Sequence, residues 1–170
     1  MVFINAAAVR RNRVLRSGTL TALSRSKESV MRWAEVVDNP FLQNLPFKIE
    51  LNRWGRIEMS PVSNRRGLTQ ADMAGEMRRR RGGKVLAECS IQTSDGVRVA
   101  DVAWISNKRL QEIGLVTPFP KAPELCVEIK SPANSWAEMH VKAGHYLEAG
   151  AEEVWVVTLD GNRTVIKPDA

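Results

Sequence analysis

The chain has 170 residues, of which 44% are hydrophobic and 26% are charged, and this composition excludes a disordered, fibrous or multidomain protein. Its formal net charge of +6 lies entirely in residues 1–27, which carry six Lys or Arg residues and no acid, so the remaining chain has 19 residues of each sign. No apolar run approaches the roughly 20 residues of a membrane span, and we expect a cytoplasmic protein with no membrane partner and no organic cofactor.

These patterns predict two segments, a basic leader at 1–27 and a single folded domain at 28–170. An acid-free basic leader is compatible with a nucleic-acid arm, an organelle transit peptide or a solvated tail. We favour a flexible tail, because the leader has no apolar periodicity, and we expect the domain to keep its stability without it.

Hydrophobic periodicity predicts a helix, a β-hairpin and a second helix in the first half of the chain. Apolar residues recur at helical spacing over 28–38, and a proline-containing turn ends this helix. Apolar and polar residues then alternate over 47–51 and 56–60, which predicts the hairpin. The second helix spans 68–80 and ends before a pair of glycines. Its predicted inward side chains are Leu68, Ala71, Met73, Ala74 and Met77.

In the second half of the chain, the pattern of apolar residues predicts three strands, a helix and a last strand. Their ranges are 84–91, 97–105 and 124–130 for the strands, 134–149 for the helix and 153–159 for the last strand. A short helical turn and a proline-rich loop fill 106–123, and a short tail ends the chain. The order from residue 68 is therefore helix, three strands, helix, strand.

Cysteine and histidine do not indicate a metal site. Cys89 and Cys126 both lie in apolar runs and form no CxxC pair, which predicts reduced core thiols rather than a disulfide or a zinc site. His140 and His145 are five residues apart, so a helix places them on different faces.

Two acids lie in predicted strands where packing alone would favour apolar residues. Asp101 sits in VADVA among small and β-branched residues. In the strand 124–130, alternation places Glu128 and Lys130 on the same face, about 6.5 Å apart. A buried carboxylate costs several kcal/mol unless it is paired, hydrogen-bonded or bound to a cation. The economical explanation is a divalent metal, because Mg²⁺ prefers oxygen ligands.

An Asp followed by Glu-x-Lys is also a layout for phosphodiester hydrolysis. Lys130 would orient the attacking water and offset charge that develops on the attacked phosphate. The spacing alone occurs by chance in many chains, and a strand edge with Glu and Lys is usually a solvated face or an ion pair. Its location within consecutive buried strands favours the chemical interpretation.

Longer motifs surround these residues, namely MSPVSNRRG, AECSIQTSDGVRVADVAWIS and APELCVEIKSPANSWAEMHVKAGHYLEAGAEEVWVV. Together they resemble the Uma-type putative restriction endonuclease family, a bacterial branch of the PD-(D/E)XK nuclease superfamily, from about Phe47 to about Asp160. The resemblance implies an α/β fold with a restriction-endonuclease-like core, a mixed β-sheet flanked by helices. It also places the family's acidic positions on Asp101 and Glu128, and the acid of the first core strand on Glu88.

Two positions depart from the family's pattern. The residue two after the glutamate is commonly apolar in the family, and the lysine role is assigned to the following helix, at the position of Lys142; this chain has both Lys130 and Lys142. The His usual after the Ser-Pro motif is Arg66 here, which leaves the role of that His open. Glu88 is then a third metal ligand, or a buried acid paired with Lys130.

The helix 134–149 supports a role for Lys142 by spacing. Glu138, Lys142 and Tyr146 follow at four-residue intervals along one stripe, and Ser135 with Glu138 forms a capping box. An ion pair between Glu138 and Lys142 that stabilises the helix explains the same spacing equally well, and Tyr146 is expected to be a core aromatic with its hydroxyl bonded.

Arginines at both ends of the second helix are candidates for DNA contacts. They are Arg65, Arg66, Arg78 and Arg79. Each neutralised phosphate releases counterions and increases affinity. Arginines at a helix C-terminus also complement the helix dipole, which is an alternative for the run that begins at Arg78.

The sequence predicts a Mg²⁺- or Mn²⁺-dependent endonuclease that hydrolyses phosphodiester bonds in DNA. Asp101 and Glu128, with the carbonyl of Ile129, would hold the metal, and Lys130 or Lys142 would position the attacking water. Strand geometry favours Lys130. The alternative is a nuclease-fold module that has lost catalysis and binds nucleic acid or protein. A structural subunit of a homodimer, with acids and lysines in buried ion pairs, is the third interpretation.

Overall fold

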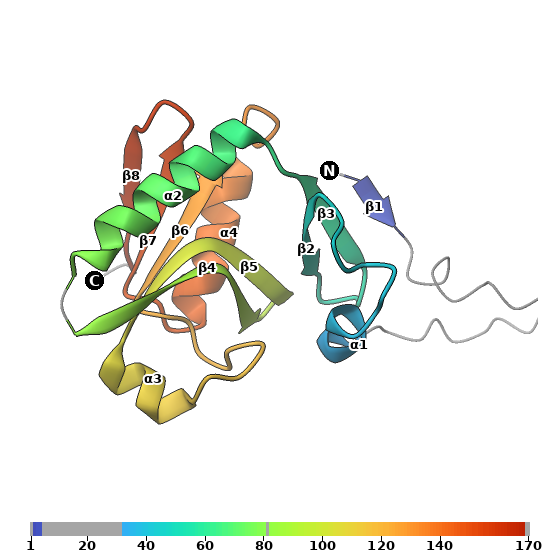
Figure 1. The fold of residues 1–170 in the computed structure, drawn as a ribbon, viewed down its shortest axis with the longest axis horizontal. Coiled ribbons are helices and arrows are strands. Elements are labelled where there is room, and N and C mark those ends of the chain that lie inside the picture. Colours follow the sequence, from blue (N-terminus) through green and yellow to red (C-terminus); the bar gives the residue numbers. More distant parts are fainter. Residues whose placement is uncertain (1, 5–31, 81, 169–170) are drawn as a thin grey trace, which may run out of the picture.

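The computed structural model describes residues 2–4, 32–80 and 82–168. Residues 2–4 of the predicted leader form a short strand, β1 (Val2–Ile4); the rest of the leader and residues 28–31 of the first predicted helix lie outside the described residues. The other elements (Figure 1) are α1 (Trp33–Val37), β2 (Phe47–Leu51), β3 (Ile57–Pro61), α2 (Asn64–Arg78), β4 (Gly83–Thr93), β5 (Gly96–Ser106), α3 (Asn107–Ile113), β6 (Leu125–Lys130), α4 (Trp136–Glu148), β7 (Glu153–Thr158) and β8 (Arg163–Ile166).

The described strands form one mixed sheet in the order β1-β3-β2-β5-β6-β7-β8, with β4 paired to β5. Strands β6 and β7 run parallel and are connected through α4, as a parallel pair requires. The other paired strands run antiparallel. Figure 1 shows the hairpin β2–β3 and helix α1 to one side of the central strands. The predicted α/β fold with a mixed sheet flanked by helices is therefore confirmed.

Helices α2 and α4 contribute to separate cores on the central strands. Met77 of α2 packs in a core with Val127 of β6. Tyr146 of α4 packs in another core with Cys126 of β6. Cys126 and Val127 are neighbours in one strand, and alternation points them to opposite faces, as the sequence predicts. Glu128 has the same strand parity as Cys126 and therefore faces α4.

Helix α2 begins earlier than predicted, and its inward face is more polar. Ser63 caps the helix by accepting a hydrogen bond from the Arg66 N–H. Leu68 and Ala71, predicted to face inward, are exposed, whereas Arg66 and Thr69 are buried. The prediction is confirmed for Met73, Ala74 and Met77, which pack in the core with Val127. It is wrong in the first turns of the helix, where Arg66 turns toward an acid in the sheet.

The segment predicted as a C-terminal tail is a strand. β8 pairs antiparallel with β7, from Val154 with Ile166 to Val157 with Arg163. Its side chains are mostly exposed, with Ile166 partly buried. An edge strand with so few buried side chains carries little hydrophobic alternation, which explains why the prediction missed it.

Cys89 and Cys126 are both buried free thiols, as predicted. Burial raises the pKa of the Cys89 thiol to about 12, so this thiol is protonated at neutral pH. None of the described helices combines the length and apolar character that crossing a membrane requires.

Gly96 permits the tight turn between β4 and β5. Its φ is +85°, and a Cβ atom there would clash with the Leu51 carbonyl oxygen. We expect Gly96→Ala to lower the free energy of unfolding by about 2 kcal/mol or more. Gly75→Ala is the matched control, because nothing lies within 4 Å of its Cβ position in α2, and it should stabilise by about 0.5–1 kcal/mol. Urea denaturation measures both, and effects of the same sign would contradict the assignment.

Candidate functional site

Asp101 lies at the centre of the candidate site, in the middle of β5, with 0% of its surface exposed. Its Oδ2 accepts the Ile129 N–H of β6 at 2.7 Å. Its Oδ1 accepts hydrogen bonds from the Lys48 ammonium at 2.7 Å and from the Arg66 guanidinium. Burial opposes ionisation, but attraction to Lys48 and Arg66 outweighs it and lowers the Asp101 pKa to about 2. Asp101 is therefore a carboxylate at neutral pH.

Glu128, on the neighbouring strand β6, is the second buried acid, and only 2% of its surface is exposed. Its Oε1 accepts a hydrogen bond from the Tyr146 hydroxyl at 2.6 Å and forms an ion pair with the Lys142 ammonium at 3.1 Å. Its Oε2 accepts the Lys48 ammonium at 3.3 Å. One ammonium thus joins Asp101 and Glu128. Burial alone would lower the pKa of Lys48, but these carboxylates raise it above its usual range.

Glu50 of β2 is a third buried acid at the site and holds Lys142. Its Oε1 accepts the Val99 N–H at 2.7 Å and lies 2.8 Å from the Lys142 ammonium. Burial by itself would raise the pKa of Glu50. Attraction to Lys142 and the other nearby cations outweighs this effect and lowers the pKa to about 2. Lys142 therefore bridges Glu50 and Glu128, which connects β2, β6 and α4.

A further group of ion-paired side chains extends from Glu50 to the turn between β4 and β5. Arg98 donates through Nη1 to Glu58 and through Nη2 to Asp95, and its Nη1 lies 3.8 Å from Glu50. Its buried Nε has no hydrogen-bond partner among the described residues. Arg98 therefore links the hairpin β2–β3 to β5.

A cavity of about 360 Å³ opens beside these groups. Ala137 and Val141 of α4 form part of its wall. Its Lys, Arg, Asp and Glu lining residues are Lys48, Glu50, Glu58, Arg66, Asp95, Arg98, Glu128, Glu138 and Lys142. With Asp101 bonded behind this wall, acidic residues outnumber Lys and Arg by two. One of these acids, Asp95, is also paired with Arg53, which lies outside the lining, at 2.7 Å.

Glu88 lies in β4 between the register pairs Ala87–Val102 and Cys89–Ala100, in a backbone conformation that is rare for glutamate. Its φ is +51°, in the left-handed region. Leu86 and Cys89 both pack in the core that contains α4 residues, although regular alternation would place them on opposite faces. The strand therefore changes its alternation at Glu88, and such strained positions are often found at functional sites.

Gln70 of α2 ties Glu88 to the site. Its Nε2 donates to Glu88 Oε1 at 2.9 Å and to the Asp101 carbonyl oxygen at 2.7 Å. Loss of solvent around the carboxylate raises the Glu88 pKa, although much of the residue is exposed. Gln70 thus joins Glu88 to Asp101, and no ion pair between Glu88 and Lys130 is present among the described residues.

Acid should destabilise the protein through Glu50. Its folded pKa of about 2 lies below its ordinary value of 4.5, so its stabilising contribution is full above pH 4.5 and is lost as the pH falls toward 2. We expect Glu50→Gln to make the free energy of unfolding less dependent on pH in this window. Urea denaturation of both proteins at pH 6, 4 and 3 measures this, and parallel pH profiles would contradict it.

Comparison with known proteins relates this geometry to a family. The sequence matches the family model of Uma2, described as "Putative restriction endonuclease", over residues 33–166. The chain belongs to the Uma2 family. A solved structure from Anabaena variabilis ATCC 29413, described as a putative nuclease belonging to DUF820, has a TM-score of 0.56 and 21% sequence identity, covering 72% of this chain and 78% of that chain. Comparison with curated proteins gives no match.

Of the two candidate lysines in this Uma2 chain, the structure brings Lys142 to the acids. The Lys130 ammonium lies 5.6 Å from the Trp136 ring centroid and 3.4 Å from the Ser131 carbonyl oxygen. Among the described residues, no ion pair joins Lys130 to Asp101 or Glu128. Lys130 is the last residue of β6, so its long side chain is free to follow the aromatic ring rather than the strand face. Its position does not support the predicted role beside the acids.

The helix α4 of this Uma2 chain confirms the predicted capping box and leaves Lys142 free of Glu138. The Ser135 hydroxyl accepts the Glu138 N–H, and the Glu138 carboxylate accepts the Ser135 N–H at 2.7 Å. Lys142 is instead paired with Glu50 and Glu128. The alternative of a Glu138–Lys142 ion pair is therefore not the arrangement observed. Tyr146 is a buried aromatic with a bonded hydroxyl, as predicted.

The donor chemistry of this site fits Mg²⁺ or Mn²⁺. Two buried carboxylates lie close enough for a single ammonium to contact both. Mg²⁺ takes oxygen ligands and needs only one or two carboxylates from the protein, with water and phosphate completing the shell. The described residues contain no group of three or more His, Cys, Asp or Glu side chains arranged to hold a metal ion, so the fit rests on Asp101 and Glu128.

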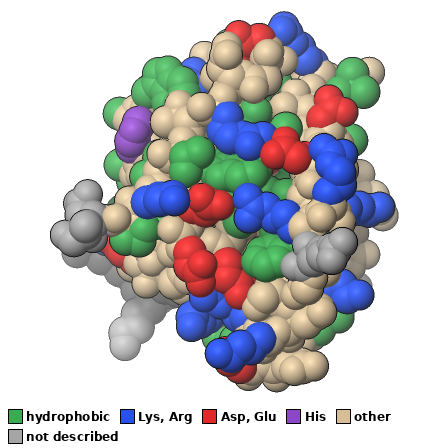
Figure 2. Space-filling model, turned by 90° about the vertical axis from the view of Figure 1, so that its left-hand side faces the viewer, with side chains coloured by type: hydrophobic (Ala, Val, Ile, Leu, Met, Phe, Trp, Pro, Cys, Tyr) green, Lys and Arg blue, Asp and Glu red, His purple; other side chains and the backbone are tan. Residues whose placement is uncertain are grey.

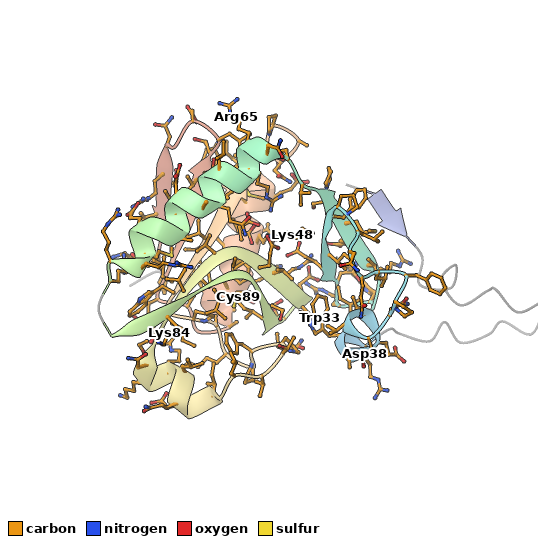
Figure 3. All side chains as sticks on the ribbon, viewed as in Figure 1. Trp33, Asp38, Lys48, Arg65, Lys84 and Cys89 are labelled. Carbon is orange, nitrogen blue, oxygen red and sulfur yellow. The ribbon has the colours of Figure 1, made fainter. Side chains whose placement is uncertain are left out.

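The predicted DNA-contacting arginines of the Uma2 chain separate into two kinds. Arg66 is buried and bonded to Asp101, so it belongs to the site. Arg65, Arg78 and Arg79 are exposed, and Figure 3 shows Arg65 at the N-terminal end of α2. In the face drawn in Figure 2, Lys and Arg side chains are interspersed with Asp and Glu. That face carries no uniformly basic surface.

The sequence prediction did not assign Lys48 and Glu50 to the site. Both alternate with apolar residues in β2, a pattern that is also typical of a solvent-facing strand surface. The signal that could have found them is that the hairpin falls inside the region resembling the family, and its second strand contains the Ser-Pro motif.

Proposed function

We propose that this chain is a metal-dependent endonuclease that hydrolyses phosphodiester bonds in DNA. One observation carries the proposal: Asp101 and Glu128, both buried on adjacent strands, share a single cation, the Lys48 ammonium. Two buried carboxylates of this kind persist only where positive charge compensates them. Membership of the family described as "Putative restriction endonuclease" supports the proposal.

The carboxylates of Asp101 and Glu128, with the Ile129 carbonyl, would hold Mg²⁺ or Mn²⁺. When bound, the metal supplies positive charge that stabilises an attacked phosphate and makes water more acidic. The protein's own part is to fix the acids: the Ile129 N–H orients Asp101, and the Tyr146 hydroxyl orients Glu128. Lys142, held by Glu50, would orient the attacking water and offset charge on the phosphate.

The exposed arginines of α2 are the proposed contacts to the DNA backbone. Arg65 and Arg78 lie at opposite ends of the helix, about 20 Å apart by helix rise. Such contacts fix the position of the duplex without reading its sequence. Arg79 would add a further phosphate contact at the C-terminal end of α2. The cavity is lined by both Glu128 and Arg66, so it lies near the N-terminal end of the same helix.

A second candidate function is favoured by a separate observation. Asp101 Oδ1 is bonded to both Lys48 and Arg66, so its charge is already neutralised by the protein. A site satisfied in this way suits a nuclease-fold module that binds nucleic acid or protein without cleaving it.

Cleavage of DNA distinguishes the two functions. Supercoiled plasmid and single-stranded RNA should be incubated with the full chain in Mg²⁺, in Mn²⁺ and in chelator. We expect DNA nicking that requires metal and disappears in Asp101→Asn and Glu128→Gln, which keep the shape of the side chains. Binding without cleavage in every metal would support the binding module, and cleavage of RNA alone would overturn the DNA assignment.

A further inference from the structure

Lys48 occupies the position between the two acids that would hold a metal. Its side chain comes from β2, and only 5% of the residue is exposed. The ammonium lies 2.7 Å from Asp101 Oδ1 and 3.3 Å from Glu128 Oε2. Figure 3 shows Lys48 in the space between the hairpin and the central strands. A divalent cation held by the same two carboxylates would need the oxygens that Lys48 now contacts.

An ammonium and a divalent cation cannot share this gap. Two like charges a few ångströms apart repel by several kcal/mol in the partly desolvated interior of a protein. Asp101 Oδ1 is further engaged by Arg66, and Glu128 Oε1 by Lys142 and Tyr146. Lys48 is the cation that contacts both acids, through Asp101 Oδ1 and Glu128 Oε2, so its contacts are among those that entry of a metal must break.

The structure leaves room for Lys48 to withdraw. Lys48 lines the cavity of about 360 Å³, together with Glu50. Glu50 lies two residues along the same strand and faces the same side. A lysine side chain has several rotatable bonds, so its ammonium is able to leave Asp101 and remain near another carboxylate.

We propose that Lys48 is a built-in counter-ion that competes with the divalent metal for Asp101 and Glu128. This inference rests on the proposed metal site of the endonuclease. In the metal-free protein, Lys48 compensates the two buried charges and keeps the site folded. Metal binding then requires its withdrawal, so the lysine sets the metal concentration at which the site is loaded.

Calorimetric titration with Mn²⁺ tests the competition. Lys48→Met removes the charge at similar length, and Lys48→Gln removes the charge but keeps an N–H donor for Asp101. Both should bind Mn²⁺ roughly tenfold or more tightly than the wild type, because no ammonium has to be displaced. Lys48→Arg, the matched control that keeps the charge, should bind no more tightly than the wild type.

Thermal melting gives a second readout that does not depend on activity. In chelator, Lys48→Met should melt below the wild type, since two carboxylates lose a shared cation. Saturating Mn²⁺ should raise its melting temperature more than that of the wild type. If Lys48→Met does not fold in chelator, Lys48→Gln provides the same comparison, and circular dichroism verifies its fold.

Equal or weaker Mn²⁺ affinity in Lys48→Met and Lys48→Gln would overturn the inference, as would the absence of Mn²⁺ binding in all variants. Failure of the proposed function is distinguishable from this result. Metal-dependent cleavage by the wild type without tighter binding in the variants removes only the role of Lys48. Tighter binding in the variants without cleavage by the wild type removes only the endonuclease.

Discussion

Lys142→Ala should lower the rate of metal-dependent DNA cleavage by roughly 10² to 10⁴, the range for loss of a positioned proton-transfer group or electrostatic stabiliser. The Lys142 ammonium lies 3.1 Å from Glu128 Oε1 and 2.8 Å from Glu50 Oε1. It is thus fixed beside the acid that would hold the metal. Initial rates at saturating Mn²⁺ measure the effect, and Mn²⁺ affinity should not weaken, because a cation has been removed.

Lys130→Ala is the matched control for that experiment. Lys130 follows Glu128 by two residues, but its ammonium lies over the Trp136 ring. We expect its removal to change the cleavage rate by no more than a few-fold, through loss of a surface charge near DNA. A large loss in Lys130→Ala with little change in Lys142→Ala would reverse the assignment. A large loss in both would mean that Lys130 moves when substrate binds.

Asp101→Ala should lower the free energy of unfolding by about 3–5 kcal/mol, the usual cost of removing one partner from a buried ion pair. The Arg66 guanidinium and Lys48 ammonium would lose the carboxylate oxygen to which they donate. The Ile129 N–H would also lose its acceptor. Asp101→Asn should cost less, because its carbonyl still accepts hydrogen bonds at a similar position.

The control for this change is an acid whose own side chain is largely exposed to solvent. Glu152 pairs with Arg109 at 3.1 Å, and its side chain is 69% exposed. Glu152→Ala should change the free energy of unfolding by about 1 kcal/mol or less. Urea denaturation at neutral pH compares the variants. Equal losses in Asp101→Ala and Glu152→Ala would show that the buried cluster contributes no more than a surface pair.

The sequence was sufficient to locate the two central acids. Asp101 and Glu128 stand out because each interrupts a buried strand, and strand alternation correctly placed Glu128 on the face opposite Val127, which the structure shows to be the face toward α4. The sequence also predicted the cap of α4 from Ser135 and Glu138. These features depend on the spacing of residues a few positions apart, which can be read directly from a single sequence.

The cations of the site depend on contacts between distant segments. Lys48 meets Asp101 across 53 residues of chain and Glu128 across 80 residues. No local pattern distinguishes a hairpin face that packs on acids from one that faces water. Arg66 was predicted to contact DNA, but the turn of α2 places it inside the sheet's charge cluster. Strand alternation predicted that Lys130 lies on the same strand face as Glu128, but its ammonium lies over the Trp136 ring instead.

The most direct measurement is a crystal structure of the full chain grown with Mn²⁺ and recorded at a wavelength where manganese scatters anomalously. We predict one anomalous peak between the carboxylates of Asp101 and Glu128, with the Lys48 ammonium withdrawn from both. No peak at saturating Mn²⁺, with Lys48 still 2.7 Å from Asp101 and 3.3 Å from Glu128, would contradict a divalent-cation site formed by these two acids.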